Sequence, residues 1–201
     1  MQDAVAQLLP QRRGHFVFES GHHGQVWLDL ELLFLHPERV QPLAEALAER
    51  LRGFGAAVIC GPLVEGAFVG LAVARALGLP FSYSEPTRDD VEADLFPVSY
   101  PIPRPLHPQL RGQRVAIVND VINAGSAVRG TFIDLQSCGA EVVSLASLAA
   151  LGDWAERFAT AERLNMVTLE KFANSVWEPA TCPLCANGEP LIDPASAMGT
   201  R

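Results

Sequence analysis

The segment from Arg114 to Gly139, RVAIVNDVINAGSAVRGTFIDLQSCG, constrains the fold of this chain more than any other. Its apolar run Val115 to Val118 predicts a buried strand, and the residues from Val128 to Leu135 carry apolar side chains at helical spacing. The polar pair Asn119-Asp120 and a turn of small residues lie between them. Amide groups at such a helix start bind phosphate, and a carboxylate accepts hydrogen bonds from sugar hydroxyls. The segment therefore predicts a site for a phosphorylated sugar.

The rest of the chain alternates between strand-like and helix-like segments. Strands are predicted at His15–Phe18, Gln25–Leu30, Ala56–Cys60, Phe81–Ser84, Glu141–Leu148 and Met166–Leu169, with helices at Pro37–Arg52, Gly66–Leu77 and Trp154–Leu164. A turn at Gly21 to Gly24 separates the first two strands. Alternating strands and helices indicate a parallel sheet, which binds ligands at the carboxyl ends of its strands. Gly61 and Asn119 both stand at such ends.

Composition limits the class of protein. A chain of 201 residues with 49% hydrophobic content can bury one sizeable core, so a single domain is expected. A formal charge of −8 argues against a nucleic-acid partner. The sequence has neither a long apolar run nor a signal-peptide pattern, which predicts a cytoplasmic protein with no membrane association. Its four cysteines are expected to be reduced thiols.

Several motifs resemble those of one enzyme family. Asn119-Asp120 followed by Asn123 to Ala127 is similar to the phosphoribosyl pyrophosphate (PRPP) loop of the type I phosphoribosyltransferases, where two acidic residues precede V-I/V-T-T-G-G-S/T. Gly14 to Val40 resembles the N-terminal G-x-F-x-L-x-S-G-x-x-S element of the orotate branch, and Gly61 to Phe81 resembles its G-P-x-x-G-G-x-x-L-A loop. The tail from Trp177 to Leu191 is similar to the C-P-L-C tail of some orotate enzymes.

The resemblance implies an α/β fold with a core parallel sheet flanked by helices and a small hood. It divides the single domain into a hood and base-pocket element at 1–36, a PRPP-binding core at 37–151 and a C-terminal extension at 152–201. Within the core, the proline-rich segment at 85–110 corresponds to a flexible lid. The implied reaction is transfer of 5-phosphoribose from PRPP to a planar nitrogen heterocycle, with orotate as the first guess. Mg²⁺ bound through PRPP and a homodimer are implied as well.

The resemblance also assigns roles to individual residues. Asp120, Asn119 and Arg88 are the implied catalytic residues. The PRPP site comprises Asn119, Asp120, Asn123, Ala124, Gly125, Ser126 and Ala127. The pyrophosphate site comprises Gly61, Pro62, Leu63, Val64, Glu65 and Arg104. The base pocket comprises Ser20, His22, His23 and Trp27.

The chain departs from the family pattern at three places. Asn119 replaces a carboxylate, which weakens support for a cationic sugar by roughly 1 to 2 kcal/mol. Glu65 adds negative charge beside the pyrophosphate site, and the lid has no lysine, because Lys171 is the only one in the chain. Arg88, Arg104 and His107 are its candidate cations. Two alternatives therefore stay open: a PRPP- or nucleotide-binding sensor of the same fold, and a transferase for a different base.

Cys182 and Cys185 form a lone C-x-x-C motif. A structural zinc site needs four ligands, and this motif supplies two. The sequence therefore favours reduced thiols over a metal, although two tails meeting in a dimer could supply four ligands.

Overall fold

The computed structural model describes residues 9, 11–18, 20–88 and 98–194. Its centre is a five-stranded sheet in the order β4-β3-β7-β8-β9, in which every neighbouring pair is parallel. The strands are β3 (Val58–Pro62), β4 (Phe81–Ser84), β7 (Arg114–Ile122), β8 (Glu141–Leu151) and β9 (Asn165–Phe172). The predicted α/β architecture with a core parallel sheet is confirmed.

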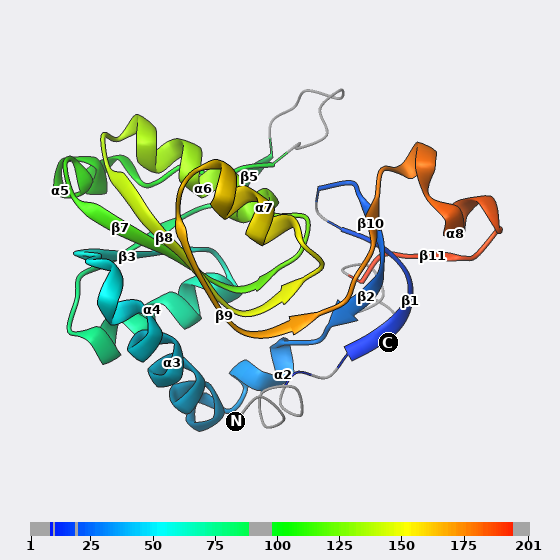
Figure 1. Cartoon of the computed structure of the whole chain (residues 1–201), viewed down its shortest axis with the longest axis horizontal. Helices are drawn as coiled ribbons and strands as arrows, with labels where there is room; N and C mark the ends of the chain where they lie inside the picture. Colours follow the sequence, from blue (N-terminus) through cyan, green and yellow to red (C-terminus); the bar gives the residue numbers. More distant parts are fainter. Residues whose placement is uncertain (1–8, 10, 19, 89–97, 195–201) are drawn as a thin grey trace.

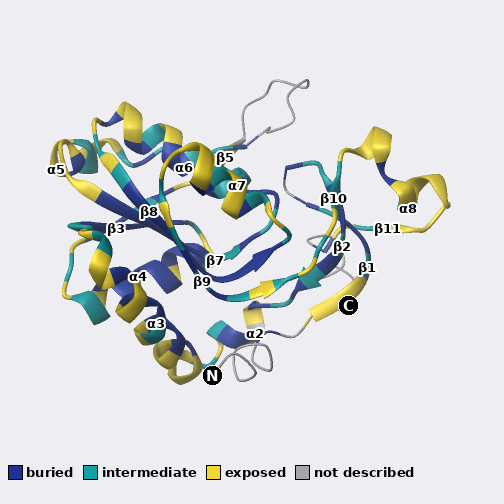
Figure 2. Cartoon of the chain, viewed as in Figure 1, coloured by how far each residue is buried: buried dark blue, intermediate teal, exposed yellow. Residues whose placement is uncertain are grey.

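Helices cover both faces of this sheet (Figure 1). One face carries α3 (Pro37–Leu51) and α4 (Glu65–Leu77), and the other carries α6 (Ser126–Ser137) and α7 (Trp154–Ala161). Leu47 and Val73 lie in the buried cluster on the first face, and Leu135 lies in the cluster on the second. Figure 2 shows the central strands as the most deeply buried part of the molecule. This matches the near-continuous apolar character of strands covered on both faces.

The predicted strands and helices all occur, but β7 is longer than expected. It continues past Val118 to Ile122, so Asn119 and Asp120 belong to the strand instead of following it. β8 likewise runs to Leu151 and pairs with β7 as far as Ala150. The short helix α2 (Glu31–Phe34) was not predicted, because four residues are too few to show a period.

The second sheet joins the two ends of the described chain. Its order is β10-β2-β1-β11, formed by β1 (Gln11–Val17), β2 (His23–Leu28), β10 (Val176–Trp177) and β11 (Leu191–Ile192). Between β10 and β11 lie a 3₁₀ turn, η3 (Pro179–Thr181), and a short helix, α8 (Pro183–Ala186). We call β1, β2, the described residues between them and the segment 176–192 the hood. His23 begins β2, so its predicted position in a turn is wrong.

Residues 89–97 of the predicted lid lie outside the described residues. The chain on either side of them forms a two-stranded antiparallel ribbon of β5 (Thr87–Arg88) and β6 (Val98–Ser99). The 3₁₀ turn η2 (Arg104–Leu106) and the helix α5 (His107–Leu110) follow. Movement of this segment over the site stays a prediction.

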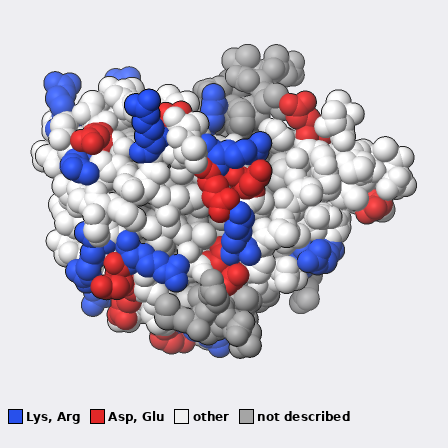
Figure 3. All heavy atoms as spheres, in the orientation of Figure 1, with Lys and Arg blue, Asp and Glu red and all other residues white. Residues whose placement is uncertain are grey.

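Charged side chains are interspersed on the face shown in Figure 3, where acidic and basic groups lie side by side. Lys171 illustrates this, because its ammonium group pairs with Glu156 at 2.6 Å. Among the helices of the described residues, none combines the length and apolar character required to cross a bilayer.

Candidate active site

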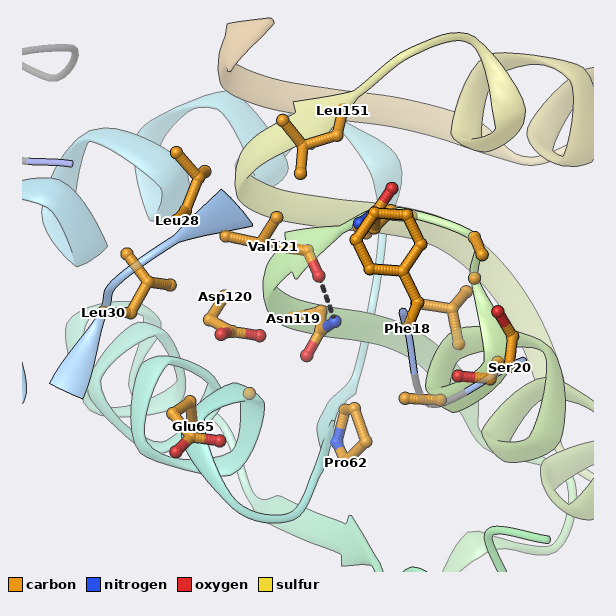
Figure 4. A pocket seen from close by; sticks show the side chains of 18 of the residues that line it. Phe18, Ser20, Leu28, Leu30, Pro62, Glu65, Asn119, Asp120, Val121 and Leu151 are labelled. Carbon is orange, nitrogen blue, oxygen red and sulfur yellow. Dashed lines mark hydrogen bonds between the residues drawn. The ribbon is translucent and has the colours of Figure 1, made fainter. Parts of the chain in front are cut away.

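A cavity of about 250 Å³ opens between the hood and the carboxyl ends of β3 and β7. Figure 4 shows the side chains around it, with Asp120 and Asn119 from β7, Pro62 from the end of β3, Glu65 from the start of α4, and Phe18 and Ser20 from the hood. Three groups of residues separated in sequence therefore meet at one place. The predicted site residues on its lining are Ser20, Trp27, Pro62, Leu63, Val64, Glu65, Asn119, Asp120, Asn123, Ala124, Gly125, Ser126 and Ala127.

The turn after β7 leads directly into α6. Gly125 adopts a φ of 82° immediately before Ser126 begins α6. A Cβ atom at Gly125 would overlap the indole ring of Trp154, so glycine is required here both by conformation and by space. The first amides of a helix have no partner within the helix and carry partial positive charge. Residues 123 to 127, which include the start of α6, lie on the cavity lining.

Asn123 connects this turn to the hood. Its Oδ1 accepts a hydrogen bond from Asn174 Nδ2 at 3.2 Å, and Asn174 Oδ1 accepts one from the Gln25 backbone N–H at 3.3 Å. The side chain of Asn123 is therefore engaged by the protein. Phosphate binding by this turn stays a prediction.

Asn119 is buried, with 7% of its surface exposed. Its Nδ2 donates to the Val121 carbonyl at 2.8 Å, the hydrogen bond drawn in Figure 4. A Cβ atom at Gly66 would overlap Asn119 Oδ1, so this oxygen lies directly against α4. Asn119 lines the cavity, but its amide is held by the protein, and its role as an acceptor for sugar hydroxyls stays a prediction.

Asp120 has the most perturbed carboxyl group near the cavity. Burial is the largest cause that raises its pKa from the ordinary value of 3.8 to about 7, and the negative charges of Glu65 and Glu31 act in the same direction, while hydrogen bonds from the Val121 and Asp120 amides act in the opposite direction. A carboxyl group with this pKa exists in both protonation states near neutral pH. An arriving cation would favour its ionised form.

The predicted pyrophosphate residues divide into two groups. Pro62 to Glu65 line the cavity, where Glu65 opens α4. Gly61 does not line it; a Cβ atom there would lie 2.6 Å from the Gly66 carbonyl oxygen, so this glycine lets α4 pack closely on β3. Arg104 belongs to η2 and is absent from the lining. The backbone of Arg88 in β5 pairs with that of Val98 in β6. The side chain of Arg88 lies outside the described part of the structure.

The hood side of the cavity is aromatic. Phe18 and Trp27 stack with ring centroids 6.3 Å apart and an interplanar angle of 18°. Of the predicted base-pocket histidines, His22 lines a separate cavity and His23 turns its Nδ1 toward His15 Nε2 at 3.0 Å. Neither lines the main cavity, and their role in binding a base stays a prediction.

The sequence interpretation missed several residues on the lining. These are Phe18, Leu28, Leu30, Glu31, Tyr100 and Leu151, together with residues adjoining the predicted loops. Phe18 stands at the leucine position of the N-terminal motif, so the signal for it was present. Tyr100 and Leu151 come from distant segments, and no local pattern places them here.

The cavity has an unusual charge balance. Three carboxyl groups, those of Glu31, Glu65 and Asp120, line it, and no lysine or arginine among the described residues does. Such a surface repels a polyphosphate unless a cation accompanies it. Oxygen donors of this kind suit Mg²⁺, which binds through a few carboxylates together with substrate phosphates.

Comparison with known proteins identifies the family. The model of the phosphoribosyl transferase domain matches residues 31–179. The chain belongs to the type I phosphoribosyltransferases. This phosphoribosyltransferase is 30% identical over 195 residues to the orotate phosphoribosyltransferase of Wolinella succinogenes, covering 91% of this chain and 90% of that protein. It is 28% identical over 187 residues to the one of Caldanaerobacter subterraneus, covering 92% and 90%.

Solved structures have the same fold as this phosphoribosyltransferase. The adenine phosphoribosyltransferase from Thermoanaerobacter pseudethanolicus aligns with a TM-score of 0.67 and 21% identity, over 86% of this chain and all of that one (100%). The orotate phosphoribosyltransferase from Aeropyrum pernix aligns with a TM-score of 0.64 and 20% identity, over 85% and 93%. The resemblance to the orotate branch thus comes from the sequence relatives, while the structures show the fold.

Proposed function

We propose that this phosphoribosyltransferase transfers the 5-phosphoribosyl group of PRPP to a ring nitrogen of orotate and releases pyrophosphate. The observation that carries the proposal is the meeting of Asp120 and the Gly125–Ser126 helix start on one cavity. The orotate enzymes of Wolinella and Caldanaerobacter, similar over about nine tenths of the chain, support orotate as the acceptor.

In this reaction the bond between the ribose C1 and the pyrophosphate oxygen breaks, a bond from C1 to the base nitrogen forms, and the proton of that nitrogen is released to solvent or to the departing pyrophosphate. Positive charge develops on the sugar, and pyrophosphate leaves with the bonding electrons. Asp120 accepts hydrogen bonds from the ribose hydroxyls, and its negative charge stabilises the cationic sugar. The turn from Asn123 to Ala127 binds the 5′-phosphate, and Pro62 to Glu65 border the departing pyrophosphate. Trp27 and Phe18 bound the base on the hood side.

The reaction requires a cation, and the acidic cavity fits one. When bound, Mg²⁺ would supply positive charge to the pyrophosphate oxygens. The carboxylates of Asp120 and Glu65 are of the ligand type that Mg²⁺ prefers, and they would hold it. Arg104 from η2 and Arg88 from β5 are the chain's own candidates for covering the leaving group. Both flank the segment that we propose acts as a lid.

A second candidate function follows from the absence of lysine and arginine side chains on the described lining of the cavity. Orotate is an anion, and the described lining carries three carboxyl groups with no basic side chain. A neutral base, or PRPP binding without transfer, suits that lining better. These alternatives predict different results in one set of assays.

The experiment combines calorimetric titration of PRPP with Mg²⁺ and a pyrophosphate-release assay using orotate, adenine, guanine and hypoxanthine. Release with orotate alone supports the proposal. Release only with another base identifies a different transferase, and binding without release for every base identifies a sensor. Absence of PRPP binding contradicts all three. Asp120→Asn is the matched control, because it preserves side-chain size and removes the charge.

We further propose that the protein is a homodimer in the cytoplasm. Val64, Phe68 and Leu71 lie at helical spacing along α4 and are 51%, 49% and 54% exposed, and Leu35 nearby is 70% exposed. This stripe begins at the pyrophosphate loop, so a second copy placed there would border the cavity. Sedimentation should give a dimer for the wild type and a monomer for Phe68→Glu, whereas a monomeric wild type would contradict the proposal. The free cysteines suit a reducing compartment.

A further inference from the structure

Four side chains with metal-binding atoms meet inside the hood, outside the cavity described above. They are His15 of β1, His23 of β2, and Cys182 and Cys185, which flank the start of α8. One ligand atom of each lies within 4.8 Å of those of the other three. We propose that these four residues of one chain bind a structural zinc ion.

The distances match the edges of a tetrahedral site. Zinc bonds of about 2.3 Å to sulfur and about 2.0–2.1 Å to nitrogen imply edges of about 3.3 Å between nitrogens and about 3.6 Å between nitrogen and sulfur. His15 Nε2 lies 3.0 Å from His23 Nδ1. Cys182 Sγ and Cys185 Sγ lie 3.5 and 3.6 Å from His15 Nε2, and Cys185 Sγ lies 3.2 Å from His23 Nδ1. The four atoms thus surround a space the size of one zinc ion.

The outer contact of His15 favours the same interpretation. Its Nδ1 lies 2.9 Å from the Glu189 carbonyl oxygen, which can only accept, so the proton belongs on Nδ1 and the Nε2 lone pair faces the cluster. Metal-binding histidines characteristically donate their second ring N–H in this way. His15, His23 and Cys182 are 2%, 6% and 3% exposed, and Cys185 is exposed, so three of the four ligands are shielded from water.

A second group of three candidate metal ligands differs from this cluster, because two of its members contact the protein backbone. His107, Asp134 and Cys138 also lie near one another. However, His107 Nε2 contacts the Ile102 carbonyl at 2.9 Å, and Asp134 Oδ2 accepts from the Ile102 amide at 2.7 Å. Their polar atoms hold the chain before α5 in place. This group supplies three ligands and serves as an internal control.

The chemistry and position of the four residues indicate a structural role. Two thiolates and two neutral imidazoles balance the charge of Zn²⁺, and four protein ligands leave no open position for water. The cysteines follow the histidines by 159 to 170 residues, so the ion would fasten the tail to the β1–β2 hairpin. The β11–β1 pairing, His15 opposite Leu191, makes the same connection through the backbone.

The test measures metal content in the full-length protein purified without chelator. We expect about one zinc ion per chain, with X-ray absorption showing two sulfur and two nitrogen neighbours. Cys182→Ser combined with Cys185→Ser should lower the content at least tenfold, as should His15→Ala. The matched control Cys138→Ala removes a buried thiol of the second group and should keep the zinc.

Three outcomes would overturn the proposal. The first is wild-type protein that takes up no zinc on incubation with zinc salts. The second is a shell of four sulfurs with about half a zinc ion per chain, because that result indicates a site shared by the tails of two copies. Retention of zinc by His15→Ala would exclude that histidine. Because these variants can fail to fold, cobalt uptake by the wild type, with the absorption bands of a tetrahedral thiolate site, provides a separate measurement. None of these readouts depends on transferase activity.

Discussion

The side-chain oxygen of Asn119 occupies the space that a Cβ atom on Gly66 would fill. This contact brings β7 and the first turn of α4 together at the cavity, so the sugar side and the pyrophosphate side of the proposed site share one packing interface. It also holds Asn119 in an orientation where its Nδ2 donates to Val121. A change at residue 119 therefore acts on both local structure and charge.

Asn119→Asp separates these two effects. The carboxylate adds charge facing the cationic sugar, so turnover should rise by roughly tenfold. The Val121 carbonyl loses its donor, so the free energy of unfolding should fall by about 1 kcal/mol. Steady-state kinetics and urea unfolding measure the two quantities, with Asn119→Ala as a control that lowers both. Unchanged turnover in the Asp variant would show that charge at this position is irrelevant to the reaction.

The raised pKa of Asp120 predicts a pH-dependent cost in stability. Between its ordinary value of 3.8 and about 7, the unfolded chain has released this proton while the folded chain retains it. Stability from this group is therefore highest in acid and falls as the pH rises to about 7. Asp120→Asn should be more stable than the wild type at pH 8, by on the order of 2 to 4 kcal/mol, and equally stable near pH 4.

Denaturant unfolding of both proteins across that pH range checks the prediction for Asp120. The variant should also lose transferase activity while gaining stability. A stability difference that stays constant with pH would mean that Asp120 titrates normally.

Gly125→Ala should disrupt the proposed phosphate turn. Alanine disfavours the φ of 82° and its Cβ overlaps the Trp154 ring, so the variant should lose about 2 kcal/mol of stability or more and bind PRPP at least tenfold more weakly. Adding Trp154→Ala removes the overlap but leaves the unfavourable backbone conformation. The double variant should therefore recover stability only in part. Calorimetry with PRPP measures the affinity, and full binding by Gly125→Ala would exclude the turn as the phosphate site.

Glu65→Gln should lower the pKa of Asp120, because Glu65 is the stronger of the two carboxylates that raise it. The acidic limb of the kcat/KM profile for PRPP should shift to lower pH. Glu31→Gln is the matched control and should produce the smaller shift. Carboxyl NMR of Asp120 reports the pKa directly, and an unmoved resonance in Glu65→Gln would contradict the electrostatic coupling.

Local pattern predicted the central sheet well. Runs such as Val115 to Val118 are buried on both faces, so their apolar character is continuous and easily recognised. The end of β7 was harder to predict, because Asn119 and Asp120 are polar residues inside a strand, held there by pairing with β8. The polar side chains of Asn119 and Asp120 suggested that the strand ends at Val118, whereas its pairing with β8 continues β7 to Ile122.

The candidate site was predictable where its residues are consecutive. The turn from Asn123 to Ala127 and the segment Pro62 to Glu65 are short motifs, and both line the cavity. The two histidines predicted for the base pocket do not line this cavity, because the direction of His23 depends on the pairing of β2 with β1 and β10. Its proximity to Cys185 arises from tertiary structure alone.

The pairing of β11 with β1 affects the order of events during synthesis. Because strands from the first and last parts of the described chain share a sheet, the N-terminal hairpin leaves the ribosome long before its partner strand exists. The α/β core can fold meanwhile, since its five strands are complete by Phe172. A nascent chain arrested at that point would contain the complete five-stranded sheet, while the hood would still lack β10 and β11. Shortening the gene from its 3′ end should thus impair base recognition before it unfolds the core.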